Sequence, residues 1–182
     1  MADDWEGVTL KAIVLCCAVL VVLASWTAAS AQPAAASGSH LTKAEQTMLA
    51  LLNHARTSRG RHALRAVSSL ERASRAHSRD MLRRGYFSHD SHGGGSYAVR
   101  LRAFGYSSAG CTAWKVGEII GWRQGGAASA RRIFRRWMKS PVHRRVILQR
   151  GFRDVGIGAV TGTLCGLSGV RMVTVDFGHR VK

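Results

Sequence analysis

The chain has 182 residues, of which 46% are hydrophobic, and a formal net charge of +17 at pH 7. No internal repeat is evident and no Cys-x-x-Cys pair is present, which excludes repeat architectures and that class of metal or redox site. The basic balance favours anionic partners such as wall polymers, lipid headgroups or nucleic acid. Alternatively, the many arginines reflect a genome biased toward GC-rich Arg codons, and they are then scattered over the solvent-exposed surface without a binding role.

The first 31 residues form a hydrophobic leader. Residues 12–31 carry no charge, and the small-x-small pattern at residues 29–31 suits cleavage after Ala31. Asp3, Asp4 and Glu6 stand where a signal peptide is positive, and about 20 apolar residues also span a bilayer. The leader therefore predicts export, either as a cleaved signal peptide or with residues 12–31 retained as a membrane anchor.

A linker and one domain follow. Residues 32–40 are small and polar, with one Pro and one Gly, as is typical of linkers. Residues 41–182 are long enough for one domain with a hydrophobic core. The leader takes one Lys and three acids, so the rest of the chain holds 26 Lys+Arg against 7 Asp+Glu. We expect a monomer, and export argues against a specific nucleic acid partner.

The first half of the domain is predicted to be helical. Residues 42–45 and 68–71 match the capping box, so a helix is expected to begin at each. These helices should end near Gly60 and at Gly85. Ser96 can cap a third, short helix.

The second half is predicted to mix helices and strands. Apolar runs predict strands over residues 116–122, 154–160 and 170–177. Helices are expected over residues 127–139 and 143–149. Between them Ser140-Pro141 restarts the chain, with Pro at a helix N1 position. Helices that precede and interleave with a few late strands predict an α+β or layered αβα domain.

One predicted helix carries a cationic face. On residues 127–139, the arginines lie opposite the apolar side chains Ile133, Phe134, Trp137 and Met138. This face consists of Arg131, Arg132, Arg135 and Arg136. Guanidinium groups match phosphate and carboxylate, so the face is expected to bind an anionic polymer or membrane surface in a salt-dependent way.

Three side chains are candidates for chemistry. Glu118 lies within an apolar strand, where a carboxylate must be paired or face a cavity. His89 follows a helix end, and His143 lies in the first turn of a short helix. Two imidazoles and a carboxylate could bind Zn²⁺ with an open fourth position, or form a hydrogen-bonded cluster. Ser140, three residues before His143, is better explained as a helix cap than as a nucleophile.

Cys111 and Cys165 are the two cysteines outside the leader. An even pair in an exported chain predicts one disulfide. It would close a loop of about 55 residues and stabilise the fold by roughly 3–4 kcal/mol in the chain-entropy model.

Short motifs run in order through nearly the whole domain. They include Ala76-His77-Ser78-xx-Met81, Phe87-Ser88-His89, Gly117-Glu118, Ser140-Pro141-Val142-His143-Arg144 and Asp176-Phe177-Gly178. In order and spacing the chain resembles the CAP superfamily, also called SCP-like, which includes the cysteine-rich secretory, antigen 5 and pathogenesis-related proteins. The resemblance is closest to the short bacterial branch of that superfamily.

The resemblance implies a three-layer αβα sandwich with a central cleft. His89, Glu118 and His143 match the residues that line the cleft, and in some members the two histidines bind a divalent cation. Ile119 stands where the family usually has Asn, and the second glutamate of eukaryotic members, expected near Ser140, is missing. Both departures weigh against catalysis. The family is linked to lipid or sterol binding, wall-related roles and, rarely, proteolysis.

Three functions follow as expectations. The first is an extracytoplasmic protein that binds a lipid or cell-wall-derived ligand, with a divalent cation such as Zn²⁺ in the cleft. The second is a metal-assisted hydrolase of peptide or wall substrates in which Glu118 is the general base. The third is a polyanion-binding module that uses the arginine face. The first is favoured because no nucleophile is apparent.

Overall fold

The computed structural model describes residues 40–125 and 129–182. The predicted leader and its cleavage site lie outside the described residues, as does most of the linker. Within the described ranges, no helix combines the length and apolar character needed to cross a bilayer.

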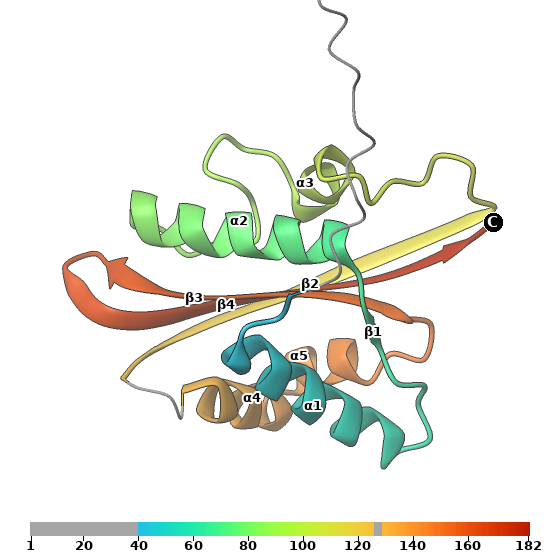
Figure 1. Cartoon of the computed structure of the whole chain (residues 1–182), viewed down its shortest axis with the longest axis horizontal. Coiled ribbons are helices and arrows are strands. Elements are labelled where there is room, and N and C mark those ends of the chain that lie inside the picture. The colour runs from blue at the N-terminus through green and yellow to red at the C-terminus, as the bar shows by residue number, and fades with distance from the viewer. Residues whose placement is uncertain (1–39, 126–128) are drawn as a thin grey trace, which may run out of the picture. The chain divides into compact units, whose positions relative to one another are not determined.

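A four-stranded sheet lies between two layers of helices (Figure 1). The strands are β1 (Arg65–Ala66), β2 (Ala113–Gln124), β3 (Asp154–Leu164) and β4 (Leu167–Val181), in the order β1-β3-β4-β2. Only the short β1 pairs in parallel, and β2 is an edge strand bonded to β4 alone. The sequence predicted β2, β3 and β4 with shorter bounds and did not predict β1.

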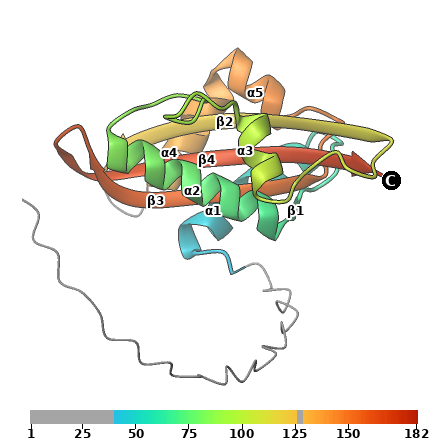
Figure 2. The same cartoon turned by 90° about the horizontal axis from the view of Figure 1, so that it is seen from above.

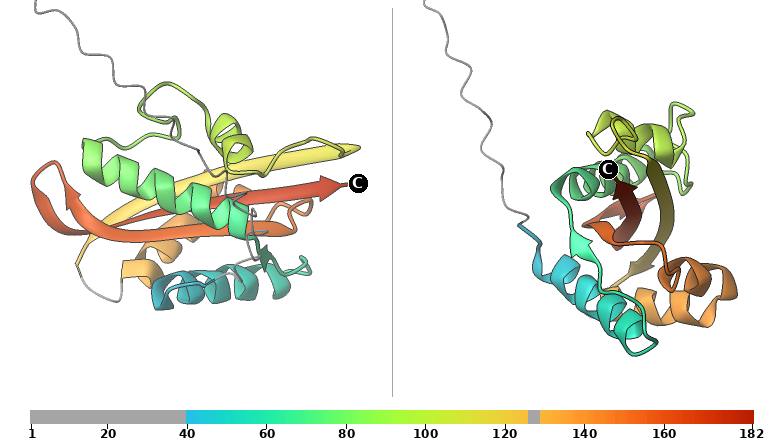
Figure 3. Two further views of the ribbon diagram at one scale, coloured as in Figure 1. Left: turned by 45° about the horizontal axis from the view of Figure 1, so that its top comes forward. Right: turned by 90° about the vertical axis from the view of Figure 1, so that its right-hand side faces the viewer.

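Two helices cover one face of the sheet and three cover the other. The first face carries α2 (Ser68–Arg84), which runs obliquely across the strands, and α3 (Tyr97–Ala103) (Figure 2). The opposite face carries α1 (Lys43–Thr57), α4 (Ser129–Lys139) and α5 (Pro141–Ile147) (Figure 3). The predicted αβα sandwich is confirmed.

Local signals set most of the helix ends. Thr42 and Glu45 form the predicted capping box of α1. Gly85 ends α2 with a φ of +67°, a left-handed conformation that glycine adopts without strain. The second predicted capping box is wrong, because Val67 is the N-cap of α2 and makes no side-chain bond. Pro141 begins α5, as predicted.

Helix α2 packs very closely on the sheet. A Cβ atom added to Gly156 or Gly158 of β3 would lie 2.1 or 2.3 Å from the α2 backbone. Ser74 and Ser78 of α2 also bond to residues of β4 and β3. Because α2 rests directly on the strands, the side chains between these layers have fixed positions.

Residues 173–177 of β4 alternate between an apolar face and a polar one. In β4, Val173, Val175 and Phe177 are fully buried in the core with α1, α4 and α5. Thr174 and Asp176 point the other way, toward α2, and are equally buried. This buried polar face is where the candidate site begins.

The predicted disulfide is wrong. Cys111 and Cys165 are both free cysteines. Cys111 precedes β2 beside the C-terminal end of β4, whereas Cys165 lies in the β3–β4 turn at its other end. At about 3.3 Å per residue, these two ends are roughly 45 Å apart, and a disulfide needs Cα atoms within about 7 Å. The prediction used only the number of cysteines and the expected compartment, neither of which reports distance.

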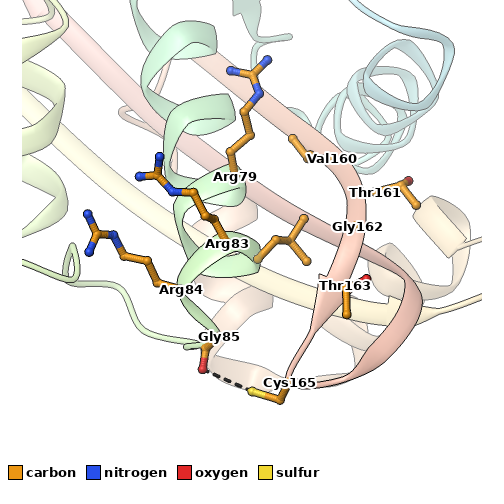
Figure 4. Close-up of a pocket in the computed structure, with 10 residues that line it drawn as sticks. Arg79, Arg83, Arg84, Gly85, Val160, Thr161, Gly162, Thr163 and Cys165 are labelled. Atoms are coloured by element: carbon orange, nitrogen blue, oxygen red, sulfur yellow. Dashed lines mark hydrogen bonds between the residues drawn. The ribbon is translucent and has the colours of Figure 1, made fainter.

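Figure 4 shows what Cys165 does instead. Its Sγ donates a hydrogen bond to the Gly85 carbonyl, at 3.2 Å, and so ties the β3–β4 turn to the end of α2. The hollow beside this contact has a volume of about 680 Å³. The guanidinium groups of Arg79, Arg83 and Arg84 extend from α2 away from Thr161 and Thr163 on β3 (Figure 4).

Candidate functional site

Glu118 is the centre of the candidate site. It lies on β2, on the sheet face that α2 and α3 cover, and its side chain is fully buried. One carboxylate oxygen, Oε1, accepts a hydrogen bond from His89 Nδ1 at 2.7 Å. The other, Oε2, accepts a bond from Arg100 Nη2. Both oxygens are therefore engaged, which meets the requirement that a buried carboxylate be paired.

Arg100 connects this carboxylate to the loop that carries His89. It comes from α3, and its side chain is 7% exposed. Besides Glu118, Arg100 Nη1 donates to Ser91 Oγ at 3.0 Å and to the His89 carbonyl at 3.4 Å. One guanidinium thus supplies the countercharge to Glu118 and fixes the backbone at His89.

Asp176 is a second buried carboxyl group beside the first. It lies opposite Glu118 in the β2–β4 register, and its Oδ2 accepts a hydrogen bond from Ser74 Oγ at 2.6 Å. Burial, and next the charge of Glu118, raise the pKa of Asp176 well above its usual range. We infer that Asp176 keeps its proton at pH values where an ordinary aspartate is ionised, which leaves Arg100 a single negative charge to balance there.

His77 fixes the loop from the other side. It is buried on α2, and its Nε2 bonds to the Ser88 carbonyl at 2.9 Å. The acceptor is a carbonyl, so Nε2 carries the hydrogen. Burial lowers the pKa of His77, and the charge of Arg100 lowers it further, so the ring is neutral. His77 is therefore a positioning residue for the backbone just before His89.

His143 approaches from the opposite layer of helices. It lies on α5, stacks on Trp137 with the ring centroids 6.4 Å apart, and bonds through Nδ1 to Ser140 Oγ at 2.8 Å. Burial lowers the pKa of His143, and the charge of His89 lowers it further. Ser140 makes no side-chain cap of α5 and orients His143 instead.

The histidines fit a metal ion better than the glutamate does. Each ring has its Nδ1 in a hydrogen bond, and no described residue bonds to Nε2 of either ring. A carboxylate on Nδ1 is the usual outer support for a histidine ligand. Both oxygens of Glu118 already accept a hydrogen bond from the protein, and its side chain is fully buried. Within residues 40–125 and 129–182, no group of three or more His, Cys, Asp or Glu side chains is arranged to hold a metal.

A groove opens beside His143 at the edge strand. Its volume is about 710 Å³, within the range of small-molecule sites. Ile120, Ile133 and Trp137 give it a buried apolar floor. Phe87 and Trp122 also line it, although they are 48% and 38% exposed. The loop before His89 thus carries one wall of this groove.

The predicted arginine face is exposed on α4. All four of its residues, Arg131, Arg132, Arg135 and Arg136, lie on the solvent side of the helix, opposite buried Ile133 and Trp137. Arg136 differs from the others because it also lines the groove. Binding of a polyanion by this face stays a prediction.

The family follows from a match to known sequences. The CAP family, described as the cysteine-rich secretory protein family, matches residues 49–176. The chain belongs to the CAP family. The match covers α2, α3, β2, α4, α5 and β3, most of α1, and β4 as far as Asp176. Every residue of the site described above lies within it.

A curated relative of this CAP protein is bacterial. The uncharacterized protein YkwD of Bacillus subtilis is 30% identical over 118 residues, which are 64% of this chain and 42% of YkwD. The chain thus spans less than half of that relative.

Solved structures share the fold at low identity. An outer surface protein of Borrelia burgdorferi superposes with a TM-score of 0.64 at 14% identity, covering 78% of this chain and 96% of that protein. An extracellular protein with an SCP domain from Bacillus anthracis gives 0.59 at 23% identity, covering 79% of this chain and 45% of that one.

Proposed function

We propose that this CAP protein works outside the cytoplasm and binds a lipid or cell-wall-derived ligand in the groove beside His143. The hydrophobic leader supports the location, as does the Bacillus anthracis relative, which is described as extracellular. The ligand site rests on the groove itself, which combines a buried apolar floor with an exposed aromatic wall. Such a lining suits a ligand with an extended apolar or ring-shaped body.

The observation that carries the proposal is that Glu118 is buried and that both of its oxygens accept hydrogen bonds from the protein. A general base needs a lone pair that a water molecule can reach. Both oxygens of Glu118 are bonded to protein donors, and the side chain is fully buried. The carboxylate therefore orients His89 and supports the groove wall, which favours binding over hydrolysis.

A divalent cation is a secondary part of the proposal. His89 and His143 would hold it through their Nε2 atoms, and water would complete its coordination. Bound there, a cation would supply positive charge beside the groove for an anionic or oxygen-rich ligand. Glu118 would act only through its bond to His89.

Mass spectrometry of what co-elutes with the protein from its native envelope tests the ligand. We expect a bound lipid or wall fragment with the wild type and a strong loss with Phe87→Ala/Trp122→Ala, which removes the aromatic wall. The matched control is Val99→Ala/Leu167→Ala. It removes two apolar side chains that are 53% and 44% exposed and do not line the groove. Equal retention by all three proteins would reject the groove as the ligand site.

A further inference from the structure

We propose that the groove selects ligands with a single anionic head on an apolar body, and that Arg123 and Arg136 bind the head. This inference rests on the proposed function and narrows it to one chemical class. It is argued from the charged side chains that line the groove. Neither the family match nor the site around Glu118 gives these side chains a role.

The charged side chains that line the groove have one sign. Arg123 comes from β2 and Arg136 from α4, and both are exposed. Neither forms a salt bridge with any residue in the described ranges. Gln124, Ser140 and His143 are the other polar side chains of the lining, and no Asp or Glu of the described chain contributes to it. A ligand there meets two cations and no competing carboxylate.

The floor of the same groove requires an apolar partner. Ile120, Ile133 and Trp137 are 3–5% exposed, and the Trp137 indole already donates its hydrogen to the Ile120 carbonyl. The floor therefore has no indole donor left to offer a ligand. A small inorganic anion would leave this surface in water, whereas an apolar chain would cover it.

The groove also differs from the rest of the cationic surface. Arg131 and Arg135 lie on the same helix as Arg136 and are also exposed, but they do not line the groove. Those side chains can attract any polyanion through long-range charge. Of the four arginines of α4, Arg136 alone lines the groove, together with Arg123 of β2. These two side chains combine charge with the apolar floor of the groove, so they should distinguish an amphiphile from a bare anion.

The same chemistry can come from a carboxylate or from a phosphate. Guanidinium groups bind both in a two-pronged geometry. Fatty acids and single-chain phospholipids therefore both qualify, and the probes below separate them.

Calorimetric titration of the full chain tests the proposal. The probes are dodecanoate, dodecyl phosphate and neutral 1-dodecanoylglycerol, below their micelle concentrations, with acetate and inorganic phosphate as bare heads. We expect at least about tenfold tighter binding of the anionic amphiphiles than of the neutral one, because each head gains charge-assisted hydrogen bonds. The relative affinities of dodecanoate and dodecyl phosphate show which head is preferred.

Two double variants locate the selection. Arg123→Ala/Arg136→Ala should abolish the tenfold preference, whereas Arg131→Ala/Arg135→Ala, which removes the same charge, should keep it. Equal loss in both variants, equal binding of the neutral probe by the wild type, or inorganic phosphate binding as tightly as dodecyl phosphate would overturn the inference. Weaker binding of every amphiphile by Phe87→Ala/Trp122→Ala, without any charge preference in the wild type, would leave the proposed function standing and the inference refuted. Absence of amphiphile binding by the wild type would refute the inference and count against a lipid ligand.

Discussion

Arg100 of α3 and Glu118 of β2 form a buried ion pair whose side chains are 7% and 0% exposed. The pair joins a helix to an edge strand, and Arg100 also donates a hydrogen bond to the His89 carbonyl. Removing one partner leaves a buried charge without compensation, which is among the most costly changes a folded protein can undergo.

Arg100→Ala should therefore lower the free energy of unfolding by about 3–5 kcal/mol, measured by urea denaturation. Arg83→Ala is the control. It breaks a contact to Asp80 in which Arg83 is 73% exposed, and it should cost less than about 1 kcal/mol. Replacing both buried partners, as in Arg100→Leu/Glu118→Leu, should recover part of the loss. Similar small effects of Arg100→Ala and Arg83→Ala would contradict the pairing.

Asp176→Asn should change how stability depends on pH. The pKa of Asp176 is raised in the folded state above its ordinary value of 3.8, so its contribution is fully present below that pH. The contribution is lost as pH rises toward the folded pKa, because the unfolded chain ionises first. Asparagine mimics the neutral acid and cannot ionise. The variant should therefore gain stability relative to wild type as pH rises above about 3.8, in urea titrations at several pH values.

Asp80→Asn should change the pH dependence of stability in the opposite direction. Hydrogen bonds from Tyr86, Arg84 and Arg83 outweigh the effect of desolvation and lower the pKa of Asp80, so its contribution is present above the ordinary value of 3.8 and is lost as pH falls. This variant should lose stability relative to wild type as pH rises. The same slope for both variants would argue against a neutral Asp176.

Reducing agents should leave the unfolding temperature of the domain unchanged. Cys111 and Cys165 are free and lie at opposite ends of β4, so no cross-link restrains the unfolded chain. Cys111→Ser/Cys165→Ser should behave like the wild type in calorimetry with and without reductant. Both thiols should be alkylated without reduction, Cys165 more rapidly because it is exposed. A fall of roughly 2–4 kcal/mol in the free energy of unfolding on reduction would show that the two cysteines do form a disulfide.

Zn²⁺ should raise the unfolding temperature if His89 and His143 bind a cation, since a ligand that binds only the folded state stabilises it. His89→Ala/His143→Ala should abolish the shift. The matched control is His54→Ala/His62→Ala, which removes two exposed imidazoles of α1 and the loop after it, outside the hydrogen-bonded site around Glu118. If this control responds to Zn²⁺ no more strongly than the site variant does, the metal proposal fails.

The sequence predicted those parts of the site that have a local signal. Glu118 was identified because it is a carboxylate within an apolar run, and Pro141 predicted the start of the helix that carries His143. Asp176 lies in a similar apolar run and could have been found by the same rule. Arg100 has no such signal, since it is one arginine among 26 basic residues outside the leader. Its role follows from the packing of α3 against β2, which brings it to Glu118.

Spatial relations account for the other differences. The cysteine pairing was wrong because the long β4 separates two residues that composition alone made partners. The arginine face of α4 was predicted from helical period, but the distinct position of Arg136 depends on β2 and α5, which the period does not describe. The groove itself is formed by side chains far apart in the sequence, from Phe87 to His143.

The most direct test of the ligand site is a crystal structure of the protein with its co-purified ligand retained. We expect density for an apolar body over Ile133 and Trp137, against Phe87 and Trp122 and within reach of His143. Density confined to the hollow beside Cys165, or to the exposed arginines of α4 away from β2, would contradict it.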